Sequence, residues 1–91
     1  MKRRIALLAG LLLSFHALAA DSVRFGNKVI TLGESEEQVI AIAGKPLSRT
    51  EVQNRYGAVI AYRLDYVKDK ETVQIYIANG QVVNIEEIFN N

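Results

Sequence analysis

The sequence predicts an α+β domain in which one short helix packs on a four-stranded antiparallel β-meander, with a short N-terminal extended segment. Three observations predict this fold: one capped helical stretch, a change of the hydrophobic period from about 3.6 to 2 after Pro46, and turn-forming residues between the alternating stretches. The chain has 91 residues, of which 49% are apolar and 23% charged. This length allows one small domain at most, and the apolar content excludes a disordered polymer.

The clearest local pattern is a helix that begins at Ser35 or the next residue and ends at Ala43. The Ser35 hydroxyl can accept from a backbone N–H three residues on while Gln38 reaches back, which is a capping box, and the two Glu residues between them suit the helix dipole. Gly44 can adopt a left-handed conformation that ends a helix. Pro46 prevents the helix from continuing.

Extended stretches are predicted on both sides of this helix. Lys28 to Leu32 precedes it, and Gly33 forms the turn between them. After Pro46, apolar residues alternate with polar ones, so one face of each strand is expected to pack against the helix. The side chains predicted on that face are Ala58, Ile60, Tyr62, Leu64, Tyr66, Val73, Ile75, Ile77, Val83 and Ile85.

Loop lengths set the register of the predicted strands. A three-residue loop that ends at a left-handed Gly57 places Val52 opposite Ile60. The next loop has four residues and places Leu64 opposite Ile75. Because register follows the buried face, these pairings keep the apolar residues of neighbouring strands together.

The last hairpin has two possible loops. A two-residue loop would put Ile75 opposite Asn84, which wastes a core position. A three-residue loop, Ala78 to Gly80, instead puts Ile75 opposite Val83. Three-residue loops with Gly in the left-handed position are common, so the sequence favours the second loop.

Residues 1–19 are predicted to be a secretory signal peptide. Three basic residues are followed by eleven residues from Ile5 to Phe15, most of them apolar, and then by Ala17-Leu18-Ala19, the small-x-small pattern that signal peptidase cuts. As a helix this run would extend only about 16 Å, which is too short to span a membrane. We therefore expect cleavage after Ala19 and one exported domain, residues 20–91, in the periplasm of a Gram-negative bacterium or secreted.

Cleavage would change the charge of the chain. The whole chain has eleven Lys and Arg against ten Asp and Glu, and three basic residues leave with the signal peptide, so the net charge moves from +1 to −2. A faintly acidic domain without a basic block has no electrostatic footprint for nucleic acid. No Cys stands at the cleavage site, so we expect no lipid anchor.

The residue types exclude most catalytic chemistry. The single His, His16, lies in the predicted signal peptide and the chain has no Cys, which excludes His- and Cys-based nucleophile systems, zinc sites and thiol chemistry from the exported domain. Glu36-Glu37 lies in the first turn of the helix, and Glu86-Glu87 on a strand points to opposite faces. We expect no enzyme, no metal and no small-molecule cofactor.

A candidate partner-binding surface lies on the other face of the sheet. Tyr76 stands between two inward residues, so it is predicted to face away from the helix, with Arg63 and Val59 among its neighbours. Tyr and Arg are typical anchors of protein interfaces. The alternative is a half-buried Tyr on a solvated face.

The residues around the helix resemble two known patterns. Gly33 to Val39, followed by Ala43-Gly44-Lys45-Pro46, resembles a family of short uncharacterised exported bacterial proteins, a domain of unknown function that usually carries a Cys pair. That similarity covers nearly the whole exported part, including Arg24 to Lys28. The same residues are similar to the SmpA/OmlA (BamE-like) domain, a small lipoprotein of the outer-membrane β-barrel assembly machine, in the helix and sheet order only.

The chain departs from both families. The two Cys positions of the first family hold Phe25 and Ala43 here, so the resemblance implies a disulfide replaced by packing, with Phe25 against the C-terminal end of the helix. The lipidated Cys of the second family is absent. What the resemblance implies is a fold and an envelope location, without catalytic residues.

Together these observations lead us to expect a non-enzymatic periplasmic interaction module. It would bind an envelope protein through the open sheet face or through an edge strand at Lys28 to Leu32. Two alternatives stay open: an inhibitor that docks on a secreted enzyme, and a small hydrolase that uses carboxylates or a Ser–Lys pair. The sequence predicts neither the identity of the partner nor the oligomeric state.

Overall fold

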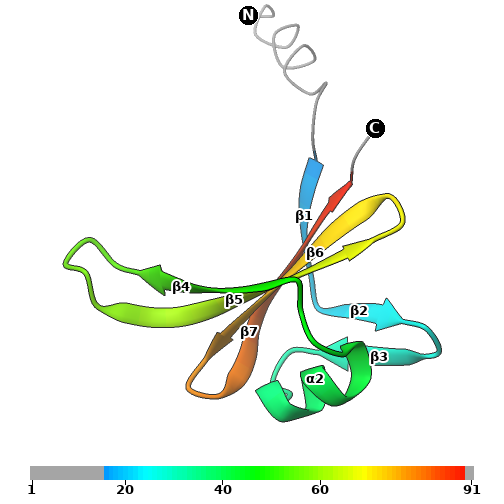
Figure 1. Ribbon diagram of the computed structural model, residues 1–91, viewed down its shortest axis with the longest axis horizontal. Helices are drawn as coiled ribbons and strands as arrows, with labels where there is room; N and C mark the ends of the chain where they lie inside the picture. The colour runs from blue at the N-terminus through cyan, green and yellow to red at the C-terminus, as the bar shows by residue number, and fades with distance from the viewer. Residues whose placement is uncertain (1–15, 90–91) are drawn as a thin grey trace, which may run out of the picture.

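A computed structural model describes residues 16–89, which form seven strands and one helix (Figure 1). In chain order the elements are β1 (His16–Ala20), β2 (Ser22–Phe25), β3 (Lys28–Thr31), α2 (Glu36–Ala43), β4 (Ser48–Gln53), β5 (Val59–Lys68), β6 (Glu71–Ala78) and β7 (Gln81–Phe89).

The sheet is larger than the predicted meander. Five antiparallel strands form it in the order β1-β7-β6-β5-β4, and β2 and β3 form a second antiparallel sheet of two strands. The predicted fold class, one helix on a four-stranded meander, is therefore wrong.

The two unpredicted elements have different causes. Strand β2 has four residues, and its only apolar ones are Val23 and Phe25, which is too short a pattern to identify a strand. It forms because Gly26, with a φ of 66°, starts a two-residue turn that pairs Phe25 with Lys28. Four of the five residues of strand β1 lie in the segment that is predicted to be a signal peptide, so they were not considered for the fold.

One face of the five-stranded sheet is covered jointly by α2 and the β2–β3 hairpin (Figure 1). The helix contributes a single fully buried side chain, Val39, while the hairpin contributes Val23 and Ile30. The sheet supplies the rest of the core: Leu64, Tyr66, Val73, Ile75, Ile77, Val82 and Ile85. The expectation that the helix alone covers this face is wrong, because the β2–β3 hairpin covers part of it. Of the apolar residues of the helix, Ile42 and Ala43 are only partly buried and Ile40 is exposed.

The ends of the helix follow the sequence prediction. Helix α2 spans Glu36–Ala43, and the Ser35 hydroxyl accepts a 3.1 Å hydrogen bond from the Gln38 N–H, which confirms the serine half of the capping box. Gly44 has a φ of 87° and donates its N–H to the Ile40 carbonyl at 2.8 Å. Gly33 turns the chain with a φ of 93°, as expected.

The central hairpin has the predicted register. Strands β5 and β6 pair Tyr62 with Ile77, Leu64 with Ile75, and Tyr66 with Val73. These pairs place the apolar side chains of both strands on the face that α2 and the β2–β3 hairpin cover.

The last hairpin differs from the prediction. Asn79 and Gly80 form a two-residue loop in which both have positive φ, 54° and 78°, which is the backbone that tight hairpins favour. A bulge after Tyr76 then pairs Ile75 with Ile85. The predicted partner, Val83, is the extra residue and is exposed. The prediction is wrong because it assumes a regular register without bulges. A bulge adds one residue to β7, so the two-residue loop can form while Ile75 still pairs with an apolar residue on the buried face.

Phe25 and Ala43, the positions of the family's Cys pair, lie at the same end of the helix. Both are partly buried and line one hollow together with Tyr66. The Phe25 ring meets the Tyr66 ring edge-on at 5.3 Å between centroids, and the Tyr66 hydroxyl donates a 2.7 Å hydrogen bond to the Gly44 carbonyl. Tyr66 thus joins β2, β5 and the helix end, although the replacement of a disulfide stays a prediction.

Most of the predicted signal peptide, residues 1–15, lies outside the described residues. Residues 16–19, its last part, lie in β1. Between residues 16 and 89, no helix is long and apolar enough to cross a membrane.

Candidate functional site

The end of the β4–β5 hairpin projects from the rest of the molecule (Figure 1). Strand β6 pairs with β5 only from Tyr62 onward, so residues 51–61, here called the arm, form a two-stranded ribbon. Val52 and Ala61 are half-buried and the other arm residues are exposed. Because two-stranded ribbons are marginally stable by themselves, the arm depends on its attachment to the sheet or on a partner.

The tip of the arm is held by one side chain. The Asn54 carbonyl oxygen Oδ1 accepts hydrogen bonds from the N–H groups of Tyr56, at 2.8 Å, and Ala58, at 3.1 Å. Gly57 completes the turn with a φ of 85°. These bonds give the loop a defined shape and leave the Tyr56 side chain 84% exposed.

A bulge turns the apolar side chains of the arm toward the helix side. The register shifts so that Val52 pairs with Ala61 while Gln53 pairs with Val59, which leaves Ile60 as the extra residue. Because paired residues share a face, this shift places Val59 on the side of Tyr62. Val59 is 41% exposed and Ile60 is 54% exposed, so the prediction that Ile60 belongs to the core is wrong.

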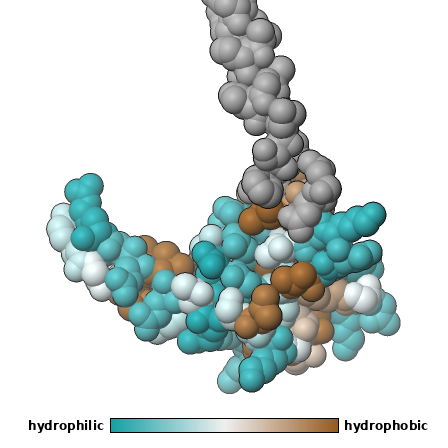
Figure 2. Space-filling view, turned by 45° about the horizontal axis from the view of Figure 1, so that its top comes forward, coloured by the Kyte–Doolittle hydropathy of each residue, from teal (hydrophilic) through white to brown (hydrophobic). Residues whose placement is uncertain are grey.

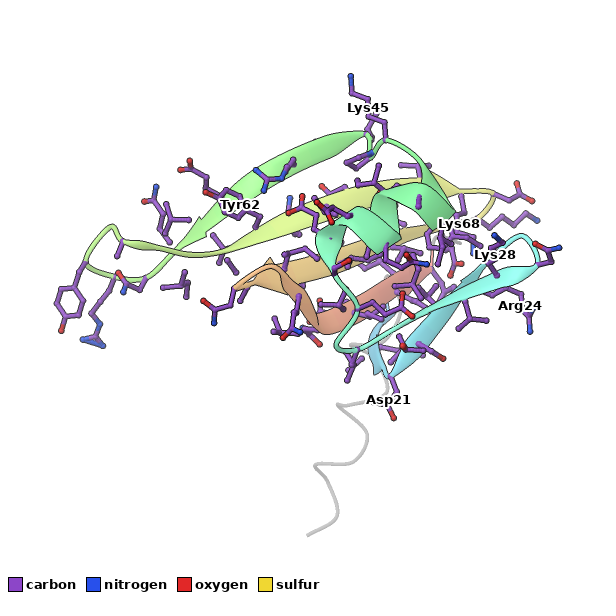
Figure 3. All side chains as sticks on the ribbon, turned by 90° about the horizontal axis from the view of Figure 1, so that it is seen from below. Asp21, Arg24, Lys28, Lys45, Tyr62 and Lys68 are labelled. Carbon is purple, nitrogen blue, oxygen red and sulfur yellow. The ribbon has the colours of Figure 1, made fainter. Side chains whose placement is uncertain are left out.

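A hollow of about 390 Å³ lies between the arm and the beginning of α2. Its lining residues are Glu36, Arg49, Val59, Ile60, Ala61, Tyr62, Ile77, Ala78, Asn79 and Gly80. We call it the arm hollow. Figure 2 shows the arm standing apart from the body of the molecule with hydrophobic side chains along part of it, and Figure 3 places Tyr62 between the arm and α2.

Arg49 joins the two walls of the arm hollow. Its Nε and Nη2 atoms donate to the two carboxylate oxygens of Glu36 at 2.8 and 3.2 Å, and its guanidinium lies 3.9 Å from the centre of the Tyr62 ring. The hydrogen bond to Glu36 holds the pKa of the Arg49 guanidinium above its usual value. A guanidinium held by two bonds and a ring is preorganised, so it loses little rotational freedom when a partner docks.

The surface predicted from the sequence is only partly assembled. Strands β5 and β6 pair Arg63 with Tyr76, and both side chains lie on the uncovered face, as expected. Val59 does not join them, because the bulge at Ile60 moves it to the arm hollow. The predicted set of Tyr76, Arg63 and Val59 is therefore divided between two surfaces.

Arg63 is engaged within the uncovered face. Its Nε and Nη2 atoms donate to the Asp65 carboxylate at 2.9 and 3.1 Å, and the Ser48 hydroxyl donates to the same carboxylate at 3.0 Å. The hydrogen bond to Asp65 is the main reason that the pKa of Arg63 lies above its usual value. Since these groups satisfy one another, Arg63 and Asp65 leave few free hydrogen-bonding groups for a partner.

The described residues bring together binding groups rather than a recognisable acid–base pair. Glu36, the carboxylate in the arm hollow, is bound by Arg49. Among residues 16–89, no group of three His, Asp or Glu residues is placed to hold a metal ion. What this site can do chemically is contact a partner through exposed apolar side chains beside the Arg49–Glu36 ion pair.

The arm hollow was not predicted from the sequence, although one pattern points to the arm. The alternating stretch from Ala58 to Tyr66 is longer than the stretch from Val73 to Ile77 that pairs with it. When a strand is longer than one of its two neighbours, its end pairs only with the other neighbour and forms a two-stranded ribbon. The contact of Arg49 with Glu36 has no such signal, because it joins two elements across the covered face.

Comparison with known proteins adds no family to this description: no family model, no curated protein and no solved structure matches the chain. The resemblances to the exported domain of unknown function and to the SmpA/OmlA domain therefore stay predictions.

Proposed function

We propose that this chain is an exported, non-enzymatic module that binds another protein of the cell envelope in the arm hollow. The observation that carries the proposal is the pair of exposed branched side chains, Val59 and Ile60, beside a guanidinium that is held in place. The buried centre of a protein interface is more apolar than its rim, and Arg is enriched in interfaces. Export rests on the predicted signal peptide.

Burial of the arm would also remove its main structural weakness. Val59, Ile60 and Tyr56 are apolar or aromatic and have no second layer over them. Apolar area removed from water stabilises a complex by about 25 cal/mol per Å² before the costs of association. A partner that covers the arm would therefore gain binding energy from residues that contribute little to the isolated domain.

Site-specific photo-crosslinking in living cells tests this proposal. A benzoyl-phenylalanine placed at Ile60 should give a crosslinked product, while the same group at Lys70, an exposed position in the turn between β5 and β6, should not. A third variant carries the group at Tyr76 on the uncovered face. Crosslinks at Tyr76 and not at Ile60 would move the site to that face, and no crosslink at any position would reject the binding module.

A second candidate, an inhibitor of a secreted enzyme, is favoured by one feature. The Asn54 turn presents Tyr56 at the end of a projecting hairpin, which is a shape that can enter the active-site cleft of another protein. Stoichiometric inhibition of an envelope or secreted hydrolase, lost in Tyr56→Ala and kept in Tyr76→Ala, would support this candidate. Without such inhibition the candidate is rejected.

A further inference from the structure

Strand β1 crosses the predicted cleavage site. It pairs antiparallel with β7 in five residue pairs, from His16 opposite Phe89 to Ala20 opposite Ile85. Cleavage after Ala19 would therefore remove four of the five residues of this edge strand (Figure 1).

The outer edge of β7 is shared by two segments. Near its beginning, Gly33 donates its N–H to the Val82 carbonyl and Val82 donates to the Glu34 carbonyl, both at 2.8 Å. From Ile85 to Phe89 the partner is β1. The Gly33–Glu34 segment follows the cut and stays in place, so cleavage uncovers only the second half of the edge.

The exported domain keeps its core after this loss. Among the residues that the structure describes, all ten buried apolar side chains follow residue 20, the first of them being Val23. Ala20, which packs against the core, also remains. Residues 20–91 thus contain every buried core side chain that the structure describes. The unpaired segment is an exposed strand edge of the kind that accepts another strand.

We propose that signal-peptide cleavage turns residues 86–89 of β7 into an acceptor for an extended strand of a partner protein that carries a basic side chain. The peptide bond between Ala19 and Ala20 is hydrolysed by water, which leaves a carboxylate on Ala19 and an amino group on Ala20. The released strand then no longer covers β7. This inference rests on the export part of the proposed function, and it adds a second contact to the arm hollow.

The acidic residues on this edge favour a partner strand with basic side chains. Opposite Glu86 and Glu87, β1 places Ala19 and Leu18, which are uncharged. Among residues 16–89, neither carboxylate takes part in an ion pair, and Glu86 accepts a 3.3 Å hydrogen bond from the Asn84 amide. Opposite charges across a strand pair are favourable and like charges are unfavourable. A basic strand therefore gains attraction, whereas a second copy joined through β7 would bring its own carboxylates close.

Amide hydrogen exchange on purified chains 16–91 and 20–91 tests the acceptor edge. Both chains contain the ten buried side chains named above. The amides within residues 86–89 that point away from β6 should exchange at least tenfold faster in the shorter chain, because their strand partner is missing. The amides of Leu64 and Ile75 serve as the control and should stay protected in both chains. Equal protection of residues 86–89 in the two chains would overturn the proposal.

A charge test in the longer chain examines the chemistry of the partner. Leu18 is exposed and lies opposite Glu87, so Leu18→Lys adds a cation at the position that a partner would fill. Exchange of the same β7 amides should be about two- to fivefold slower in Leu18→Lys than in Leu18→Glu. Equal rates, or faster exchange with Lys, would contradict a basic partner strand.

Two further measurements test the identity of the partner and the cleavage step separately. Sedimentation of the 20–91 chain at neutral pH should show a monomer, and a dimer that protects residues 86–89 would make the second copy the occupant instead. The mass of the exported protein should correspond to a chain that begins at Ala20. An uncut exported chain would overturn the processing step, whatever the result of photo-crosslinking at the arm.

Discussion

The arm end of β5 and the middle of the same strand carry the same alternating pattern and have opposite surroundings. Leu64 is fully buried between β4 and β6, under the layer formed by α2 and the β2–β3 hairpin, whereas Ile60 on the arm is exposed. Where a strand has no bulge, hydrophobic alternation predicts which way a side chain points. It does not predict whether another layer covers that side chain, and this distinction separates the core of the protein from its candidate binding site.

Truncating one residue in each of these two parts of β5 should give the largest difference in stability. Leu64→Ala removes a buried side chain and should lower the free energy of unfolding by about 2–5 kcal/mol, because it leaves a cavity in the core. Ile60→Ala should change it by about 0.5 kcal/mol or less, as is usual for exposed positions. Urea unfolding measures both. A similar loss in the two variants would mean that the arm is packed in solution.

Substituting the glycines of the β6–β7 and β4–β5 turns should also distinguish the core from the arm. Gly80 and Gly57 have similar φ values, 78° and 85°, so an Ala at either position meets about 1–2 kcal/mol of local strain. In Gly80→Ala the strain lies in the hairpin that joins two core strands, and the whole domain should be destabilised by that amount.

In Gly57→Ala the arm can relieve the same strain by opening locally, so the free energy of global unfolding should stay nearly constant. Amide exchange within residues 51–61 should become faster instead. A fall in global stability equal to that of Gly80→Ala would mean that the arm unfolds together with the core.

The sequence predicts features that are local in the chain. The cap at Ser35, the positive φ at Gly44 and the pairing of Leu64 with Ile75 each depend on residues close in sequence, and the structure confirms them. The two bulges were not predicted. A bulge at Val83 or Ile60 depends on which face the rest of the molecule covers, and that information is not present in either hairpin alone.

The candidate site was predicted less well than the fold for the same reason. Tyr76 and Arg63 face away from the helix, as the alternation indicates, but the bulge moves Val59 to the other face. Arg49 was not singled out because its partner Glu36 is distant in sequence and lies in another element. Pairs of residues from separate elements become visible only when the layers are assembled.

Tyr66→Phe should give a smaller effect than either core truncation or strain in the core hairpin. It removes the 2.7 Å hydrogen bond to the Gly44 carbonyl and should cost about 1 kcal/mol. Burial, with a smaller contribution from the negative charge of Glu36, raises the pKa of Tyr66 from 10.0 to about 12. The folded protein therefore keeps this proton at a pH at which the unfolded chain has lost it.

The stability that Tyr66 contributes depends on pH. Below pH 10 the contribution of Tyr66 is fully present, and it is lost as the pH rises from about 10 to about 12. Urea unfolding at pH 9, 11 and 12 should show declining stability in the wild type and a weaker decline in Tyr66→Phe. Parallel declines in both proteins would show that another group causes the loss.

Arg49→Lys should have the smallest effect on folding and a clear effect on the arm hollow. Lys keeps the positive charge beside Glu36 but loses the two-pronged hydrogen bond and the guanidinium plane on Tyr62. Because the pair is exposed, the urea midpoint should not change measurably. The NMR signals of the Tyr62 ring protons should move, since the group 3.9 Å from the ring centre is gone. If the midpoint instead falls as far as in Tyr66→Phe, then the base of the arm belongs to the stable core and the boundary between the two regions lies beyond Tyr62.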